Sequence, residues 1–508
     1  MEILQAINPV TRDVIEEYQR SHPEEVTKAV VKSRRSFENW KKISVLKRME
    51  YLKAIRFNIM DNLDEYAAII SEDTGKVLTE SLMSDILPTL DFIRYYEKNT
   101  EEFLKSKKRD TPLTFQGGKS YITYQPLGVI GIIAPWNFPF QLSMIPVITA
   151  LAAGNTIVIK PSNETPTIGA LIERIMIESE LPQGVVQVLQ GGREVVSALI
   201  EAKPNKIFFT GSVSTGKKIM EQASKYLIPV ELELGGKDPM IVLNDANIDR
   251  AVEGAIYGGF ANAGQVCISV ERLYLQEGIA DEFLNKLKNR VKKLNIGTQI
   301  NDDIGAMTTT DQILQVQKQI ESAIKKGARL ETPLLIEKNL FHPVILTEVT
   351  HDMEIMTEET FGPVLPVMTF KTLEEGIRLA NDSDYGLNAS IWTKDITLGK
   401  KIASELVTGN VMINDVLKNA GNPDLPFGGT KYSGIGKYHG REGLYSFSLE
   451  TSVMVNKGKK PKEVNWFPYS EKKYDGLIEL LKTLNEDKNI LKKGGDLLKI
   501  GKKLKEMD

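Results

Sequence analysis

The chain has 508 residues, of which 42% are hydrophobic and 26% are charged, and its formal net charge is −3. This length exceeds what a single hydrophobic core fills, so we expect two or more domains. The balanced charge argues against a nucleic-acid partner, and no apolar stretch is long enough to span a bilayer. The N-terminal residues lack the basic and apolar regions of a secretory signal, so we expect a cytoplasmic protein.

The N-terminal part is predicted to be mainly helical. Over residues 23–107, Val26, Ala29, Val30 and Phe37 recur near a helical period, and charged residues fill the other positions. Tyr121–Gln125 then predicts a strand ahead of a Pro-Leu-Gly turn.

From residue 129, short apolar runs alternate with helix-length segments. The runs are Val129–Ala134, Thr156–Ile159, Val185–Leu189, Ile207–Phe209 and Val230–Leu234. This alternation predicts βαβ units and a parallel sheet of the nucleotide-binding kind. A second alternation begins with Met240–Leu243 and a helix over Ile248–Phe260, so we place a domain change at Gly235-Gly236.

The C-terminal tail is basic. Residues 488–505 contain seven lysines and one acid, and leucine and isoleucine recur there at roughly helical intervals. The pattern leaves two interpretations open, a solvated or frayed helix and a helix that makes weak contact with a membrane surface.

Cys267 is the only cysteine, and it lies in Gly264-Gln265-Val266-Cys267-Ile268-Ser269. A lone thiol is either a buried small hydrophobe or a nucleophile. The small and polar residues at 261–265 favour an exposed turn and therefore the nucleophile. Metal chemistry has no obvious ligands, because the four histidines are scattered and the sequence contains neither HExxH nor CxxC.

Three segments carry further candidate residues. Phe209–Lys217 follows a predicted strand and opens a helix, which suits a pyrophosphate or a plain turn. Glu233 lies on an apolar strand beside the domain change. Two interpretations are open: Glu233 is a general base, or Glu231 and Glu233 are a pair of surface acids. Asn137 follows a strand and precedes a proline. Its amide could donate a hydrogen bond to an oxyanion, or it could simply stabilise the turn before the proline.

Together these segments resemble the aldehyde dehydrogenase superfamily. The matching motifs, in family order over about residues 5–455, are Pro135-Trp136-Asn137-Phe138-Pro139, Lys160-Pro161-Ser162, Phe209-Thr210-Gly211-Ser212, Glu233-Leu234-Gly235-Gly236-Lys237, Gly264-Gln265-Val266-Cys267, Glu359-Thr360-Phe361-Gly362-Pro363 and Pro426-Phe427-Gly428-Gly429, extended by Lys431-Tyr432-Ser433-Gly434-Ile435-Gly436.

The resemblance implies oxidation of an aldehyde to a carboxylic acid with NAD or NADP. It implies that Cys267 attacks the aldehyde, that Asn137 stabilises the oxyanion, and that Glu233 activates water to release the acid. The residues that it assigns to the cofactor are Trp136, Lys160, Ser162, Asn163, Gly211, Ser212, Glu359 and Phe361.

Asn163 departs from the family pattern, because NAD-preferring members often carry a glutamate there that binds the ribose 2′-hydroxyl. Asparagine does not repel a 2′-phosphate, so we expect NADP to be tolerated. The pocket motifs contribute the apolar residues Phe138, Leu142, Ile268 and Phe427, without a neighbouring arginine or lysine. We therefore expect medium-chain, long-chain or aromatic aldehydes. Trp466–Tyr469 and the tail are loosely similar to the class 3 and fatty-aldehyde branch.

The fold that this resemblance implies is α/β. It combines a Rossmann-like parallel-sheet cofactor domain (1–107 and 126–235), an α/β catalytic domain (236–445), small β oligomerisation strands (108–125 and 446–460) and a basic amphipathic extension (461–508). Such strands imply a homodimer or homotetramer. Two rival functions are a CoA-acylating enzyme, which commonly lacks the glutamate that Glu233 provides, and a catalytically idle structural relative.

Overall fold

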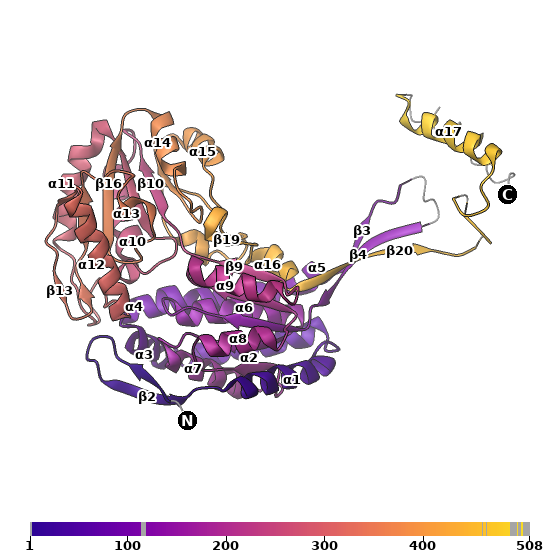
Figure 1. The fold of residues 1–508 in the computed structure, drawn as a ribbon, viewed down its shortest axis with the longest axis horizontal. Helices are drawn as coiled ribbons and strands as arrows, with labels where there is room; N and C mark the ends of the chain where they lie inside the picture. Colours follow the sequence, from indigo (N-terminus) through magenta and orange to yellow (C-terminus); the bar gives the residue numbers. More distant parts are fainter. Residues whose placement is uncertain are drawn as a thin grey trace. The chain divides into compact units, whose positions relative to one another are not determined.

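The computed structural model describes residues 3–112, 118–459, 461–463, 465–487, 495, 499 and 500. It divides into two compact units, Met1–Ser106 with Thr123–Thr451, and Lys107–Ile122 with Ser452–Asp508. The first unit contains two large sheets, each packed against its own helices (Figure 1). The fold is therefore α/β, as predicted.

A hairpin and a run of helices precede the first large sheet. These elements are β1 (Ile3–Ile7), β2 (Val14–Gln19), α1 (Pro23–Trp40), α2 (Val45–Asp61), α3 (Leu63–Thr74), α4 (Leu78–Glu80), the π-helix η1 (Ser81–Ile86) and α5 (Leu87–Leu104). The helical prediction for 23–107 is confirmed up to Leu104. The sequence does not reveal the hairpin, because only Leu4 and Ala6 of β1 are buried.

The first large sheet contains all five predicted apolar runs. Its strands are β5 (Val129–Ile133), β6 (Thr156–Lys160), β7 (Val186–Val188), β8 (Lys206–Thr210), β9 (Val230–Glu233) and β19 (Gly434–Ile435). They lie in the order β19-β9-β8-β5-β6-β7, and only β19 is antiparallel to its neighbour. The chain runs outward from β5 in both directions, so the sheet has a topological switch point between β5 and β8, where such sheets bind ligands.

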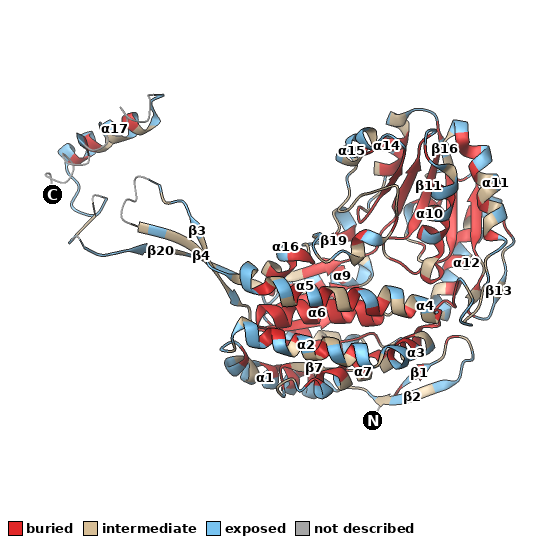
Figure 2. Ribbon diagram, turned by 180° about the vertical axis from the view of Figure 1, so that it is seen from behind, coloured by how far each residue is buried: buried red, intermediate tan, exposed pale blue. Residues whose placement is uncertain are grey.

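Helices cover both faces of this sheet. One apolar cluster joins α1, α8 (Arg193–Glu201) and α9 (Val213–Ser224) to one face. A second cluster joins α6 (Pro139–Ala153) and α7 (Pro166–Glu178) to the other face, with α2 and α5 packed outside them. Every residue of α6 is buried, and Figure 2 shows this helix red along its length. The N-terminus of α6 is thus fixed in the interior.

The chain enters the second large sheet between Glu233 and Asp238. The sheet has the order β12-β15-β16-β11-β10-β17-β18, and only β12 is antiparallel to its neighbour. This part of the chain contains β10 (Asp238–Val242), α10 (Ile248–Phe260), η3 (Ala261–Gly264), β11 (Val270–Gln276), η4 (Glu277–Ile279), α11 (Ala280–Val291), α12 (Thr310–Lys325), β12 (Arg329–Leu330), β13 (Ile336–Glu337), β14 (Leu340–Phe341), β15 (Val344–Thr347), α13 (Glu354–Thr357), β16 (Val364–Phe370), α14 (Leu373–Asn381), β17 (Ser390–Trp392), α15 (Ile396–Glu405), β18 (Met412–Ile413) and η5 (Lys418–Gly421). Strands β13 and β14 pair with each other in a separate two-stranded sheet.

After η6 (Lys431–Ser433) and α16 (Gly440–Ser446), the chain forms β20 (Ser448–Asn456) and α17 (Glu471–Asn485). Strand β20 belongs to a three-stranded sheet of order β20-β4-β3, with β4 (Gly118–Pro126) and β3 (Lys107–Arg109). Most of the basic segment 488–505 lies outside the described residues. Within the described part of the chain, no helix is long and apolar enough to cross a membrane.

Candidate active site

Four neighbouring strands of the first sheet end in candidate residues. Trp136 and Asn137 follow β5, Lys160 ends β6, Gly211 follows β8, and Glu233 ends β9. Because these strands are parallel neighbours, their carboxyl ends meet at one edge of the sheet, beside the switch point. The sheet topology therefore brings together residues that are far apart in the sequence.

Cys267 reaches this edge on a loop between η3 and β11. The last three residues of η3, directly before this loop, are at positive φ: Asn262 (φ 50°), Ala263 (φ 53°) and Gly264 (φ 72°). A Cβ at Gly264 would lie 2.1 Å from the carbonyl oxygen of Gly362, so this position requires glycine. The loop therefore follows one constrained path to the cysteine.

The prediction that this loop is an exposed turn is wrong. Residues 262–266 are buried, and Cys267 itself is half-buried. The reason is that polar side chains of the loop bond inward: Gln265 Nε2 donates to the carbonyl of Asn262 (2.9 Å), and Gln265 Oε1 accepts from the N–H of Thr308 (2.9 Å). The small polar residues form an internal framework rather than a solvent-facing surface.

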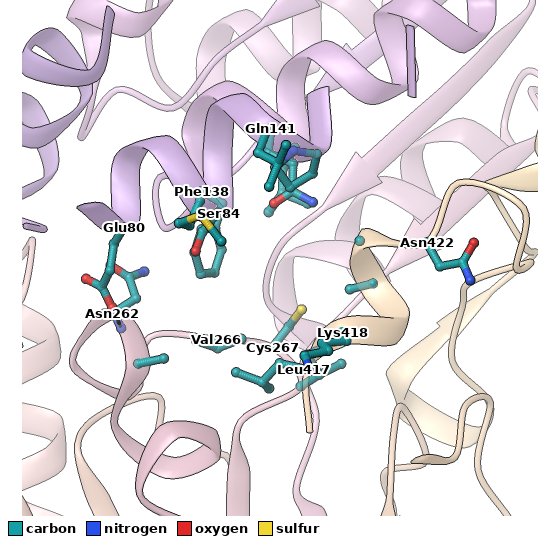
Figure 3. Close-up of a pocket in the computed structure, with 18 of the residues that line it drawn as sticks. Glu80, Ser84, Phe138, Gln141, Asn262, Val266, Cys267, Leu417, Lys418 and Asn422 are labelled. Atoms are coloured by element: carbon teal, nitrogen blue, oxygen red, sulfur yellow. Dashed lines mark hydrogen bonds between the residues drawn. The ribbon is translucent and has the colours of Figure 1, made fainter. Parts of the chain in front are cut away.

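Two hollows meet at Cys267. The first, called the apolar cavity, has a volume of about 480 Å³, and Figure 3 shows the Cys267 sulfur directed into it. Its apolar lining consists of Met83, Leu87, Pro88, Phe138, Leu142, Val266, Ile268, Leu417 and Phe427. The structure thus brings together all four residues predicted for a substrate pocket.

The expectation of a pocket without basic neighbours needs a correction. Lys418 lines the apolar cavity together with the acids Glu80 and Asp91. The ammonium of Lys418 is 2.7 Å from Asp415, and its side chain is 70% exposed. Lys418 follows the strand β18 by several residues, so the motifs alone did not place it near the cavity. The positive charge of Lys418 is thus paired with Asp415 and exposed to solvent.

The second hollow, called the strand-end cleft, has a volume of about 210 Å³. The predicted residues that line it are Trp136, Asn137, Gly211, Ser212, Glu233, Cys267, Glu359 and Phe361. The rings of Trp136 and Phe361 meet edge to face with centroids 5.5 Å apart. Glu359 Oε1 accepts from the N–H of Gly236 (3.1 Å), and burial, together with the charge of Glu271, raises the pKa of Glu359 to about 8.

Three predicted cofactor residues lie at the end of β6 and do not line this cleft. Lys160 is buried, and the charges of Glu194 and Glu164 act on its ammonium, which forms no hydrogen bond or ion pair with the described residues. Burial lowers the pKa of Lys160 to about 8. Ser162 Oγ accepts from the N–H of Glu164 (3.2 Å), and Asn163 Nδ2 donates to Glu164 Oε1 (2.8 Å).

These residues fit a dinucleotide. Ser212 is the N-cap of α9, which begins shortly after β8, so the positive end of that helix dipole lies near the end of β8 and favours an anion. A buried ammonium costs free energy unless it donates hydrogen bonds, so that of Lys160 suits an acceptor such as a ribose hydroxyl.

Glu233 is a buried carboxyl, which excludes the alternative of a surface acid. Its exposed fraction is 3%, and neither of its oxygens accepts a hydrogen bond from the described residues. Burial, followed by the charge of Glu231, raises its pKa well above the usual value. Glu231 is buried too, but it forms an ion pair with Lys206 (2.5 Å). Of these two acids, Glu233 is the one for which neither oxygen accepts a hydrogen bond from the described residues.

Asn137 is held on both its backbone and its side chain. Its Nδ2 donates to the carbonyl of Gln265 (3.0 Å), within the cysteine loop. Its carbonyl oxygen accepts from Lys76 Nζ (2.8 Å) and from Asn262 Nδ2 (3.0 Å). One hydrogen-bonded network therefore joins Asn137 to Asn262 and Gln265, which lie shortly before Cys267 in the sequence.

The sequence did not reveal Lys76, Glu80, Asp85, Asn262 and Gln265 as parts of the site. Lys76 and Asp85 fall among the many charged positions of the helical region, where a buried charge has no distinguishing pattern. Their structural signal is complete burial of an ion pair with an N–O distance of 2.6 Å.

The model of the aldehyde dehydrogenase family matches residues 2–453. A 4,4'-diapolycopene aldehyde oxidase from Methylomonas sp. is 43% identical over 97% of this chain and 93% of its own length. A betaine aldehyde dehydrogenase variant from Staphylococcus aureus, solved in complex with NAD+, has a TM-score of 0.87 at 32% identity, covering 92% of this chain and 96% of that one. An NADP-dependent enzyme of E. coli has a TM-score of 0.86 at 31% identity, covering 90% and 95%.

The chain belongs to the aldehyde dehydrogenase family. It is an oxidoreductase that oxidises an aldehyde with NAD or NADP.

The thiol should react slowly at neutral pH in the free enzyme. Burial, followed by the charges of Asp238, Glu359 and Glu233, raises the pKa of Cys267 above its ordinary value. A raised pKa leaves the thiol protonated at pH 7, so alkylation by iodoacetamide should accelerate about tenfold per pH unit between about pH 6.5 and 9. Mass spectrometry measures this rate without ambiguity, since there is one cysteine. A plateau already reached near pH 7.5 contradicts the raised pKa.

Proposed function

We propose that this aldehyde dehydrogenase oxidises long apolar aldehydes to carboxylic acids through a thioester on Cys267. The observation that carries the proposal is the meeting of the two hollows at the only cysteine. The apolar cavity suits a hydrophobic substrate, and the strand-end cleft suits the cofactor. The thiol is the one reactive group that both hollows share.

In the first step assigned to the chain, the Cys267 thiol loses its proton to water, and its Sγ then attacks the aldehyde carbon to form a C–S bond. The carbonyl oxygen gains negative charge, which the Asn137 amide and the backbone N–H of Cys267 stabilise. Asn137 Nδ2 uses one hydrogen on the carbonyl of Gln265, and its second hydrogen is available for the oxyanion.

NAD(P)+, when bound, supplies the hydride acceptor that brings the aldehyde carbon to the oxidation level of an acid. Ser212 and Trp136 would hold its pyrophosphate, Lys160 and Ser162 its adenosine ribose, and Glu359 its nicotinamide ribose. Gly211 and Phe361 complete the walls of the strand-end cleft.

Glu233 acts as the base in the second step. It accepts a proton from water, the water oxygen attacks the thioester carbon, and the C–S bond breaks to release the acid and the thiolate. Support comes from its burial without a hydrogen-bond partner among the described residues, because burial raises the pKa of Glu233 and thereby makes its carboxylate a stronger base.

The apolar lining supports a medium-chain, long-chain or aromatic aldehyde as substrate. The relative from Methylomonas is named a 4,4'-diapolycopene aldehyde oxidase, and this chain matches it over nearly its whole length. We infer that the cavity takes the aldehyde-bearing end of a substrate of this apolar class.

Two other aspects remain proposals. The three-stranded sheet has β20 and β3 at its edges, and an edge strand can pair with a strand of another copy, which supports a homodimer or homotetramer. Retention of Glu233 supports water rather than CoA as the acyl acceptor. Retention of both the thiol and the base disfavours an idle structural relative.

Activity should increase with the chain length of the aldehyde. Each methylene that enters the apolar cavity contributes about 0.8 kcal/mol, so kcat/KM should rise about fourfold per methylene from butanal upward until the cavity is filled. Succinic semialdehyde is the matched control for butanal, and its carboxylate should make it the poorer substrate. Steady-state NADH formation with identification of the acid product measures both.

A flat chain-length series, or preference for the semialdehyde, contradicts the substrate class. Dependence of turnover on added CoA, with an acyl-CoA product, contradicts the hydrolytic step.

A carboxylate at position 163 should weaken the use of NADP. In Asn163→Glu the new charge repels a 2′-phosphate, and two like charges near a protein surface repel by up to about 4 kcal/mol. We therefore expect kcat/KM for NADP to fall about tenfold or more, with a much smaller change for NAD. Asn163→Gln, which keeps the amide, is the matched control. Negligible use of NADP by the unaltered enzyme contradicts this role of Asn163.

A further inference from the structure

We propose that Lys76 and Asp85 are positioning residues for Asn137 and, through it, for the oxyanion-binding side of the active site. The inference rests on the proposed function, in which the Asn137 amide stabilises the oxyanion. Both side chains are fully buried, and they come from the segment between α3 and α5, which contributes no predicted catalytic residue. Neither is assigned a contact with the reacting atoms.

The ammonium of Lys76 has three partners, which match its three N–H donors. It donates to Asp85 Oδ2 (2.6 Å) and to the carbonyl of Asn137 (2.8 Å), and it lies 4.3 Å from the ring centroid of Phe138. Lys76 therefore holds the backbone of Asn137 by its carbonyl and also contacts the ring of the next residue, Phe138.

Asp85 fixes the other end of that loop. Its Oδ1 accepts from the N–H groups of Phe140 (3.1 Å) and Gln141 (3.0 Å), which are the second and third residues of α6. The residue at the N-cap of α6, Phe138, provides no capping side chain. Asp85 thus caps α6 from another helix, and its negative charge suits the positive end of the helix dipole.

A second carboxylate of the same segment holds the cysteine loop. Glu80 Oε1 accepts from the N–H of Asn262 (2.6 Å), one of the residues at positive φ ahead of Cys267. Asn262 Nδ2 in turn donates to the carbonyl of Asn137, the same oxygen that Lys76 binds. The segment 76–85 therefore connects the loop that contains Asn137 with the loop that contains Cys267. The carbonyl oxygen of Asn137 accepts hydrogen bonds from both the segment and the cysteine loop.

This arrangement makes the position of the Asn137 amide depend on the buried ion pair. Without Lys76, the carbonyl of Asn137 loses one of two donors, and without Asp85 the start of α6 loses its cap. A displacement of a catalytic group by about 1 Å lowers the rate about 100-fold. Loss of the pair should therefore slow steps that build an oxyanion.

The test compares two reactions of Cys267 that need no cofactor. With p-nitrophenyl acetate, the sulfur attacks the ester carbonyl, an oxyanion forms, p-nitrophenolate leaves, and the acetyl group stays on Cys267. With iodoacetamide, the sulfur displaces iodide at a saturated carbon without an oxyanion. In the variant K76M/D85N, which removes both charges together, we expect the acylation burst to fall about 100-fold while alkylation changes by less than about threefold.

Two comparisons separate positioning from a general structural role. Variant R56M/E97Q removes a largely buried ion pair between α2 and α5, away from both hollows, and should acylate at the unaltered rate. Combining K76M/D85N with Asn137→Ala should cause little loss beyond that of Asn137→Ala alone, because residues that act as a unit are not additive. Additive losses, or equal losses in acylation and alkylation, overturn the proposal.

Asp85→Asn provides a second variant if K76M/D85N does not fold. Its amide oxygen still caps α6, but its charge no longer holds the Lys76 ammonium, so acylation should fall in the same direction. A folded variant that acylates at the unaltered rate overturns the role of the pair. An unaltered rate in Asn137→Ala instead overturns the oxyanion assignment of the proposed function, so the two failures are distinguishable.

Discussion

The active site depends on one backbone oxygen, the carbonyl of Asn137, which accepts from Lys76 and from Asn262 at once. The first donor belongs to the segment after α3 and the second to the cysteine loop. Breaking a buried ion pair by removing one partner costs about 3–5 kcal/mol. The buried hydrogen bonds that meet at the Asn137 carbonyl therefore hold the two loops in one arrangement.

The loop at the cofactor end is built in a similar way. Lys237 and Glu271 form a buried pair with a 2.7 Å separation, and Glu271 accepts from the N–H groups of Thr360 (2.8 Å) and Phe361 (2.8 Å). Each side of the site thus has a lysine and a carboxylate that hold backbone groups of a loop. In contrast, neither oxygen of the Glu233 carboxyl accepts a hydrogen bond from the described residues.

Much of this arrangement could be predicted from the sequence. The five apolar runs became β5–β9, because strands buried on both faces leave a clear apolar signal. Cys267, Asn137 and Glu233 were candidates because their residue types and neighbours suit the chemistry. The burial of the cysteine loop could not be predicted, because a buried loop whose side-chain amides bond within the protein has the same composition as an exposed turn. The buried pair of Lys76 and Asp85 could not be predicted for a related reason. A charged residue in a helical region is usually exposed, and the fold is needed to show that these two residues form an ion pair.

The most direct test of the account is to trap the acyl group on Cys267. The Glu233→Gln variant is mixed with an aldehyde and NAD+, quenched within one turnover and examined by intact-protein and peptide mass spectrometry. The account predicts a mass gain equal to the acyl group, located on the peptide that contains Cys267 and absent without NAD+. Formation of NADH without any adduct on that peptide would contradict the thioester, the role of Glu233 in releasing it, or both.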